Sequence, residues 1–200
     1  MELRERIVEE ATERFLRLGI RNVTMDEIAV SLGISKRTVY ENFKDKTELV
    51  NSCMKELSKQ QELKNDQIIS SSGNVVETIF LFMQEGIKIM NSINPVFFSD
   101  LKKFYPEIWI TIHEESIRTN YRLTHKLLIK GLDEGLFRKD ISIPIVSKLF
   151  QEQMNLISDE KVFPREEFNH AEVFKNLVIN FMRGISTSRG IGIIDNIIEL

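Results

Sequence analysis

The sequence is poor in cysteine and in long apolar runs, and each shortage excludes a class of protein. The single cysteine, Cys53, cannot form a disulfide within the chain. It shares a helical face with Leu49 and Leu57, which predicts a buried structural thiol rather than a redox sensor. The longest apolar runs, such as 78–83, are too short to span a membrane. Because the charged, amphipathic start does not resemble a signal peptide, we expect a cytoplasmic protein.

Residue clusters suited to catalysis or metal binding are also scarce. Three histidines and one cysteine, without a His-x₃-His pair, do not match a zinc site. The glycines are scattered, and Gly190-x-Gly192 continues into apolar residues rather than a phosphate loop. Adjacent acids such as Glu114 and Glu115 point apart on a helix, so they do not form an acid-base pair. We therefore predict no enzyme, no cofactor and no metal; the alternative is a metal site at His113 with its two acidic neighbours.

The charge of the chain gives no overall attraction to nucleic acid, because the formal net charge is −3. The local balance differs. Residues 35–46 have four basic and two acidic side chains, whereas residues 1–48 have nine and ten. Any nucleic-acid surface in this region is therefore a small patch, for which we expect moderate, salt-sensitive affinity that dimerisation makes useful.

Residues 24–43, which read TMDEIAVSLGISKRTVYENF, have the spacing of a helix-turn-helix. Thr24 stands where an N-cap is expected, and Glu27, three residues later, completes a capping box for a short first helix. Gly33 then allows a left-handed turn that redirects the chain. Ser35 follows as the cap of a second helix, so the pattern predicts two short helices joined by a tight turn.

The second of these helices has one narrow apolar strip, formed by Val39 and Phe43. Its other side chains are mostly polar or hydrogen-bonding. A helix of this kind fits the major groove of DNA, whose base edges offer hydrogen-bond partners. An ordinary solvated surface helix is the alternative interpretation.

The run TMDEIAVSLGISKRTVYENFKDKTELV resembles the N-terminal DNA-binding domain of the tetracycline repressor (TetR) family of bacterial transcription regulators. The resemblance covers about residues 5–50 and includes the T-x-x-x-I-A core, the G-I-S turn, the x-V-Y-x-x-F recognition helix and the K-x-x-L that begins the next helix. It implies an all-α fold, with a three-helix DNA-binding domain at 1–48. A larger helical domain for ligand sensing and dimerisation is expected at 49–200.

Eight residues are predicted to contact DNA. Lys36 and Arg37, at the exposed start of the recognition helix, are candidates for base edges, and Thr24, Ser35 and Lys46 for phosphates. The role of Lys46 is implied by the resemblance. The full predicted set is Thr24, Ser35, Lys36, Arg37, Thr38, Tyr40, Asn42 and Lys46.

The rest of the chain is patterned as further helices. One helix is expected to continue from the DNA-binding domain to about residue 65, followed by a Ser/Gly loop at 68–74. The last two long helices have more apolar surface than one side of a core needs. The resemblance implies that they meet a second copy as a four-helix bundle, and an intrachain core is the alternative. The tail at 187–200 has no predicted placement.

Aromatic and methionine side chains of the body could form a pocket for a small apolar or amphipathic effector. Simple core packing is the alternative for each. The predicted pocket residues are Met83, Phe97, Phe98, Phe104, Trp109, His113, Tyr121 and Met154.

Together these features predict a DNA-binding transcriptional regulator. The expected form is a dimeric repressor that binds a palindromic operator and is released by an effector in its C-terminal domain. A ligand-responsive activator and a helical small-molecule-binding protein without a repressor role are the first alternatives. An enzyme whose active site lies in the aromatic body, and an adaptor whose polar helix meets an acidic protein, are the others.

Overall fold

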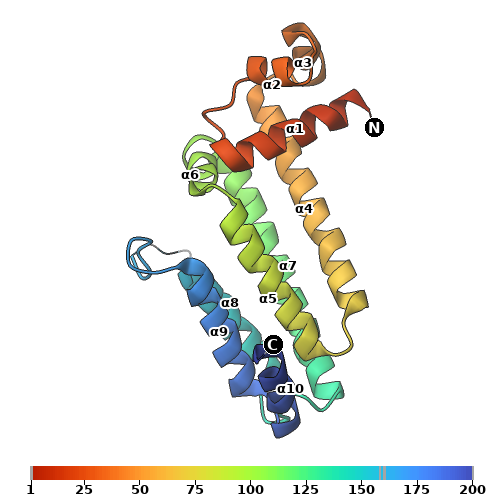
Figure 1. Ribbon diagram of the computed structural model, residues 1–200, viewed down its shortest axis with the longest axis vertical. Helices are drawn as coiled ribbons and strands as arrows, with labels where there is room; N and C mark the ends of the chain where they lie inside the picture. The colour runs from red at the N-terminus through yellow and green to blue at the C-terminus, as the bar shows by residue number, and fades with distance from the viewer. Residues whose placement is uncertain (1, 158, 160, 200) are drawn as a thin grey trace. The chain divides into compact units, whose positions relative to one another are not determined.

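The computed structural model describes residues 2–157, 159 and 161–199, which form ten helices and no strand (Figure 1). This confirms the predicted all-α fold. The helices are α1 (Leu3–Leu18), α2 (Met25–Ser31), α3 (Lys36–Asn42), α4 (Lys46–Ser71), α5 (Val75–Ser92), α6 (Pro95–Phe104), α7 (Pro106–Asp133), α8 (Ile143–Ile157), α9 (His170–Ile185) and α10 (Ser188–Ile198).

The chain divides into two compact units. The N-terminal unit comprises Met1–Lys64 and Ser92–Glu114, and the C-terminal unit comprises Asn65–Asn91 and Glu115–Leu200. The domain boundary predicted after residue 48 stays a prediction. The unit that contains residues 1–48 also includes α6 and parts of α4 and α7.

The N-terminal unit is built around an apolar core to which α1 contributes one complete face. Ile7, Ala11 and Phe15 lie on that face and are almost fully buried. They pack with residues of α2, the end of α3 and the start of α4, and Phe97 and Leu101 of α6 join the same core. Because burial of large apolar side chains is the main stabilising term, this core sets the positions of the helix-turn-helix elements.

Cys53 belongs to this core and is almost fully buried. Its Sγ lies 3.6 Å from the carbonyl oxygen of Val8. Burial raises the pKa of the thiol to about 12, so the reactive thiolate is scarce at neutral pH. The predicted structural role of this residue fits that environment.

The C-terminal unit has a second apolar core, drawn from α5, α7, α8, α9 and α10. Gly131 of α7 lies directly against the ring of Phe137, where a Cβ atom would clash with the ring. The tail that had no predicted placement forms α10, whose Ile194 is fully buried. The backbone amide of Thr187 donates to the carbonyl of Leu136 at 2.9 Å, which holds the start of α10 against the chain that follows α7.

The junction of α4 and α5 differs from the predicted loop at 68–74, because α4 continues to Ser71. The hydroxyls of Ser70 and Ser71 each donate to the carbonyl three residues earlier, so these side chains satisfy backbone groups of the last helical turn. Ile68 is also buried, which favours a helix here over an exposed loop. The predicted loop is therefore shorter than expected and ends at the N-cap region of α5.

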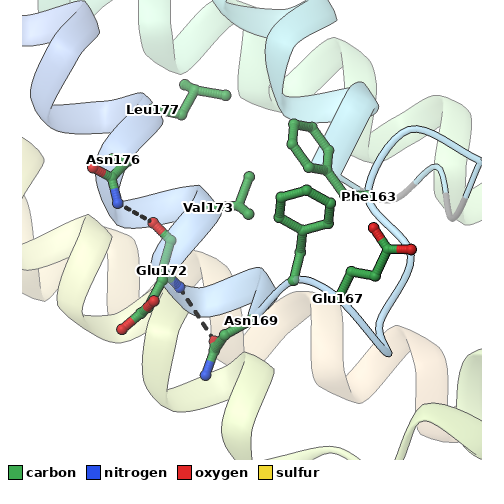
Figure 2. Close-up of a pocket in the computed structure, with 8 residues that line it drawn as sticks. Phe163, Glu167, Asn169, Glu172, Val173, Asn176 and Leu177 are labelled. Atoms are coloured by element: carbon green, nitrogen blue, oxygen red, sulfur yellow. Dashed lines mark hydrogen bonds between the residues drawn. The ribbon is translucent and has the colours of Figure 1, made fainter.

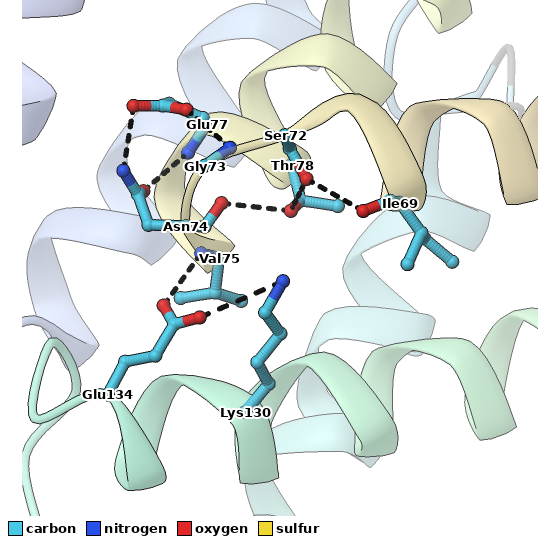
Figure 3. Close-up of polar contacts among 9 residues, drawn as sticks. All are labelled: Ile69, Ser72, Gly73, Asn74, Val75, Glu77, Thr78, Lys130 and Glu134. Carbon is cyan, nitrogen blue, oxygen red and sulfur yellow. Dashed lines mark hydrogen bonds and ion pairs between the residues drawn. The ribbon is translucent and has the colours of Figure 1, made fainter.

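A polar network holds the start of α5 (Figure 3). Asn74 Oδ1 accepts from the amide of Glu77 at 3.0 Å, and the amide of Gly73 donates to Glu77 Oε2 at 2.8 Å. The amide of Val75 donates to Glu134 Oε2 at 2.8 Å, and Glu134 lies 3.7 Å from Lys130 Nζ. Orphan amides at a helix N-terminus need such acceptors, so the network fixes where α5 begins and ties it to the end of α7.

Candidate nucleic-acid interface

The first helix of the helix-turn-helix, α2, begins with the predicted capping box. Thr24 Oγ1 accepts from the amide of Glu27 at 3.2 Å, and the amide of Thr24 donates to Glu27 Oε2 at 2.6 Å. The bond from the Thr24 amide, together with one from the Thr24 hydroxyl to Glu27 Oε2 at 2.9 Å, lowers the pKa of the Glu27 carboxyl. The exposed cap therefore already has an anionic partner where a phosphate contact was predicted for Thr24.

The turn between α2 and α3 and the start of α3 also follow the predicted pattern. Gly33 has φ 65°, a left-handed conformation, and the amide of Ile34 donates to the carbonyl of Ala29 at 3.0 Å. Ser35 Oγ accepts from the amide of Thr38 at 3.0 Å and thereby caps α3. The chain thus reverses within a few residues and places α2 and α3 side by side (Figure 1).

The helix α3 is anchored on one side and polar on the other. Val39 and Phe43 are fully buried, whereas Lys36, Arg37 and Tyr40 are exposed. Asn42 is half-buried, and its Nδ2 donates to the carbonyl of Thr38 at 2.9 Å. Five of the eight predicted contact residues therefore lie on this one helix, and Lys36, Arg37 and Tyr40 face solvent together.

Both basic residues at the start of α3 have carboxylate partners. Lys36 Nζ lies 2.8 Å from Asp26 Oδ1, and Arg37 Nε lies 2.8 Å from Glu41 Oε1. The bond to Asp26 raises the pKa of the Lys36 ammonium, which keeps this side chain charged. Exposed ion pairs of this kind are weak and exchange readily with other anions.

Lys46, the first residue of α4, has a different environment from the other predicted phosphate contacts. It is half-buried, and its Nζ donates to the carbonyl oxygen of Ile20 at 2.6 Å. Burial lowers the pKa of its ammonium, and the carboxylates of Asp100 and Glu27 partly oppose that shift. Lys46 is thus bonded to the turn between α1 and α2.

Arg4 was not predicted from the sequence but lies at the other end of α3. Its guanidinium donates to the carbonyl of Asn42, lies 3.0 Å from Glu48 Oε1 and stacks 4.0 Å from the centroid of the Phe43 ring. The Arg4 side chain therefore caps the C-terminal end of α3. No local spacing could have revealed this, because Arg4 and Asn42 are 38 residues apart.

Comparison with known proteins decides what this arrangement is. The model of the family described as bacterial regulatory proteins, tetR family, matches residues 7–53. The HTH-type transcriptional regulator YvaF of Bacillus subtilis is 24% identical over 164 residues, which cover 82% of this chain and 85% of that protein. The HTH-type transcriptional repressor KstR2 of Mycobacterium tuberculosis is 21% identical over 152 residues, covering 74% and 76%. Residues 7–53 of the chain therefore match the DNA-binding domain of the TetR family.

The fold of this protein extends the likeness beyond the helix-turn-helix. A solved transcriptional regulator from Cytophaga hutchinsonii superimposes with a TM-score of 0.73 at 18% identity, covering 92% of this chain and 98% of that one. The solved structure of KstR2 gives a TM-score of 0.57 at 21% identity, with 94% and 96% covered. The predicted function as a DNA-binding transcriptional regulator is confirmed, and the relatives are named as transcriptional regulators.

The eight predicted pocket residues of this regulator do not fall in one unit. Met83, Tyr121 and Met154 belong to the C-terminal unit, where Met83 is buried and the other two are half-buried. The other five belong to the N-terminal unit. Of these, Phe97 is buried and Trp109 is half-buried, while the exposed members are Phe98, Phe104 and His113.

Two of these five residues form a ring stack. The rings of Trp109 and His113 are stacked, with centroids 5.0 Å apart. Packing within the N-terminal unit therefore accounts for Phe97 and Trp109, and the effector role predicted for all eight residues stays a prediction.

A hollow of about 430 Å³ lies in the C-terminal unit and contains none of the predicted pocket residues (Figure 2). The rings of Phe163 and Phe168 form one wall in an edge-to-face pair with centroids 5.3 Å apart. The full lining is Phe163, Glu167, Phe168, Asn169, Glu172, Val173, Asn176 and Leu177. Within the described residues there is neither a group of His, Cys, Asp and Glu that could hold a metal ion nor a helix able to cross a membrane.

Proposed function

We propose that this TetR-family regulator is a homodimeric repressor that binds a palindromic operator and is released by a small, mainly apolar effector. The relative KstR2 is named a transcriptional repressor, which supports this sign of regulation. In the proposal, residues 1–48 read DNA in the cytoplasm and residues 49–200 sense the effector and dimerise, without enzymatic activity. The same chain acting as an activator is the alternative.

The proposed dimer is supported by an apolar stripe on α8 that is exposed to solvent in the single chain. Ile145, Leu149 and Leu156 are 61%, 56% and 46% exposed. They recur at spacings that place them on one helical face, and α8 packs against α9 through its other face. A second copy that covers these residues would complete the four-helix bundle. Two recognition helices about one DNA turn, roughly 34 Å, apart would then enter successive major grooves.

The proposed DNA contacts follow from the exposed end of α3. Arg37 is suited to a bidentate contact with guanine, with Lys36 next to it. The remaining predicted contacts, including Thr24, Ser35, Thr38, Tyr40, Asn42 and Lys46, would bind phosphates or line the groove. Phosphates would displace Asp26 and Glu41 from the two basic side chains, an exchange that weak exposed ion pairs permit.

The buried polar groups of the C-terminal unit favour an uncharged effector. Ser147 Oγ is fully buried and has no hydrogen-bond partner among the described residues, and Gln151, one turn later on α8, is also buried. The described part of this unit buries no charged side chain. A buried polar atom without a partner is costly, so a ligand hydroxyl or carbonyl would be favourable there, whereas a ligand charge would not. The solved KstR2 is named a ketosteroid transcriptional regulator, an example of an apolar ligand class.

Selection of bound genomic fragments tests this function. Tagged protein is mixed with sheared genomic DNA, the retained fragments are sequenced, and the experiment is repeated with candidate neutral, anionic and cationic small molecules. We expect fragments that share an inverted repeat and a loss of retention with an uncharged apolar compound. Retention that shows no shared sequence at any salt concentration would contradict the proposal. Transcription of the adjacent gene, measured with and without the protein, distinguishes a repressor from an activator.

Replacement of Lys46 tests its predicted phosphate contact. Lys46→Ala should weaken binding to operator and random duplexes alike, and should reduce the slope of log affinity against log salt by about one. Lys55→Ala, which removes an exposed lysine from the opposite face of α4, is the control and should leave the slope unchanged. Equal salt dependence in Lys46→Ala and the parent protein would show that the bond to Ile20 is the only role of this lysine.

A further inference from the structure

The helix α6 is joined to the end of α1 by bonds from its N-cap residue. The amide of Asn94 donates to the carbonyl of Leu16 at 2.9 Å, and Asn94 Nδ2 donates to the carbonyl of Arg17 at 3.1 Å. Both acceptors are orphan carbonyls in the last turn of α1, which need such donors. A segment almost 80 residues away in sequence thus caps the helix that leads to the helix-turn-helix.

The next turn of α6 reaches the chain between α1 and α2. Asp100 is only 7% exposed, and its Oδ2 accepts from the backbone amide of Arg21 at 2.8 Å. The guanidinium of Arg21 lies over the ring of Phe104, 4.6 Å from its centroid. Asp100 is the one charged side chain that is buried in the described part of the N-terminal unit.

The same turn is held from its other side by Lys46. Its Nζ bonds the carbonyl of Ile20, while Asp100 bonds the amide of Arg21, so one peptide unit lies between an ammonium and a carboxylate. The ammonium bonds the carbonyl oxygen, the negative end of the peptide dipole, and the carboxylate bonds the N–H group, its positive end. Such charge-assisted bonds are stronger than neutral ones. The peptide between Ile20 and Arg21 is therefore fixed in both position and orientation.

Little space is left for this turn to shift. Gly19 has φ 85°, and a Cβ atom on it would lie 2.7 Å from Val96 Cγ1 and 3.1 Å from Asp100 Oδ2. Three residues beyond Arg21 lies Thr24, the cap of α2. A displacement of the turn would therefore be passed directly to α2 and, through the short turn at Gly33, to α3.

We propose that Asp100 is a positioning residue for DNA binding: from α6, it holds the turn between α1 and α2 through the Arg21 amide and thereby sets the orientation of the helix-turn-helix. The residue does not contact DNA itself. The inference uses the established DNA-binding function, and its affinity measurements use the operator fragment expected from the proposed repressor function.

Three variants test the role of the carboxylate oxygen. Asp100→Ala removes the acceptor and should weaken binding to the selected operator fragment roughly tenfold, the effect of losing one charge-assisted hydrogen bond. Asp100→Asn keeps an acceptor oxygen and should restore most of that affinity. Ser99→Ala, next to it and exposed on α6, is the control and should bind like the parent protein. The salt slope should be unchanged in all three, in contrast to the reduced slope expected for Lys46→Ala.

Amide hydrogen exchange of the free protein provides a second measurement that needs no DNA. The Arg21 amide should exchange faster in Asp100→Ala than in the parent, Asp100→Asn or Ser99→Ala proteins, while the amides of Ile7 and Ala11 keep their protection. Asp100→Leu, which has a similar volume but no acceptor, replaces the alanine variant if that variant does not fold.

Several results would overturn the inference. Parental operator affinity in a folded variant without an acceptor would show that the bond does not position the DNA-binding helices. Equal losses in Asp100→Asn and Asp100→Ala would assign the effect to charge rather than to the bond. If the parent protein retains no DNA fragment, the proposed repressor function fails. An unchanged exchange rate of the Arg21 amide in Asp100→Ala would independently refute the positioning role of Asp100.

Discussion

Replacing Leu149 by aspartate is expected to convert the protein to a monomer and to remove detectable operator binding at the concentrations where the parent binds. Leu149 is at the centre of the apolar stripe of α8. A carboxylate at that position would be buried without a partner in the proposed bundle, which is strongly unfavourable. Because a dimer holds both recognition helices on one operator, loss of the second contact should lower apparent affinity by about 10²- to 10⁴-fold.

Light scattering after size-exclusion chromatography gives the mass of the variant, and a gel-shift titration gives its affinity. Leu63→Asp is a matched control, since Leu63 is 55% exposed against 56% for Leu149 but lies on α4, outside the proposed interface. That variant should remain dimeric and bind normally. A dimeric mass for Leu149→Asp at micromolar concentration would refute the use of this face.

Replacing Phe43 by alanine should cause the largest loss of stability within the DNA-binding elements. Phe43 is fully buried at the C-cap of α3, where its amide bonds the carbonyl of Val39 and its ring is covered by Arg4. Truncation of a buried phenylalanine costs about 3 to 5 kcal/mol of unfolding free energy, because apolar contact is lost and a cavity remains. That loss would leave α3 without its main anchor, so DNA binding should fail as well.

Urea denaturation followed by circular dichroism measures the change, and Tyr40→Ala separates stability from recognition. Tyr40 lies on the exposed side of the same helix. Its replacement should change the unfolding free energy by no more than about 0.5 kcal/mol, although it should weaken DNA binding as a proposed contact. A loss below about 1 kcal/mol in Phe43→Ala would mean that the site collapses around the smaller side chain.

The helix-turn-helix could be predicted in detail because its determinants are local. The box formed by Thr24 and Glu27, the left-handed Gly33 and the cap at Ser35 each involve residues within three positions of one another. Local bonds of this kind are encoded by spacing alone. The end of α4 was less predictable, because serines that normally mark loops here bond their own helix.

Some partners of the predicted site residues could not be predicted, because they come from distant parts of the chain. Lys46 meets the carbonyl of Ile20 across 26 residues, and Asn42 meets Arg4 across 38. Spacing also gave no information on which aromatic side chains share a unit, so the predicted pocket residues divide between the two units. Patterns of apolar residues indicate which face of a helix is buried but not which neighbour buries it.

The two ion pairs at the start of α3 have a consequence for how the protein searches the chromosome. In the proposed DNA complex, Asp26 and Glu41 would compete with phosphate for Lys36 and Arg37, so binding would exchange a carboxylate for the nucleic acid. Counterion release alone would then contribute little affinity, and non-operator sequences would be held only briefly. Binding would last longer where base-edge contacts add to that exchange, so the two ion pairs would select against non-specific sequences.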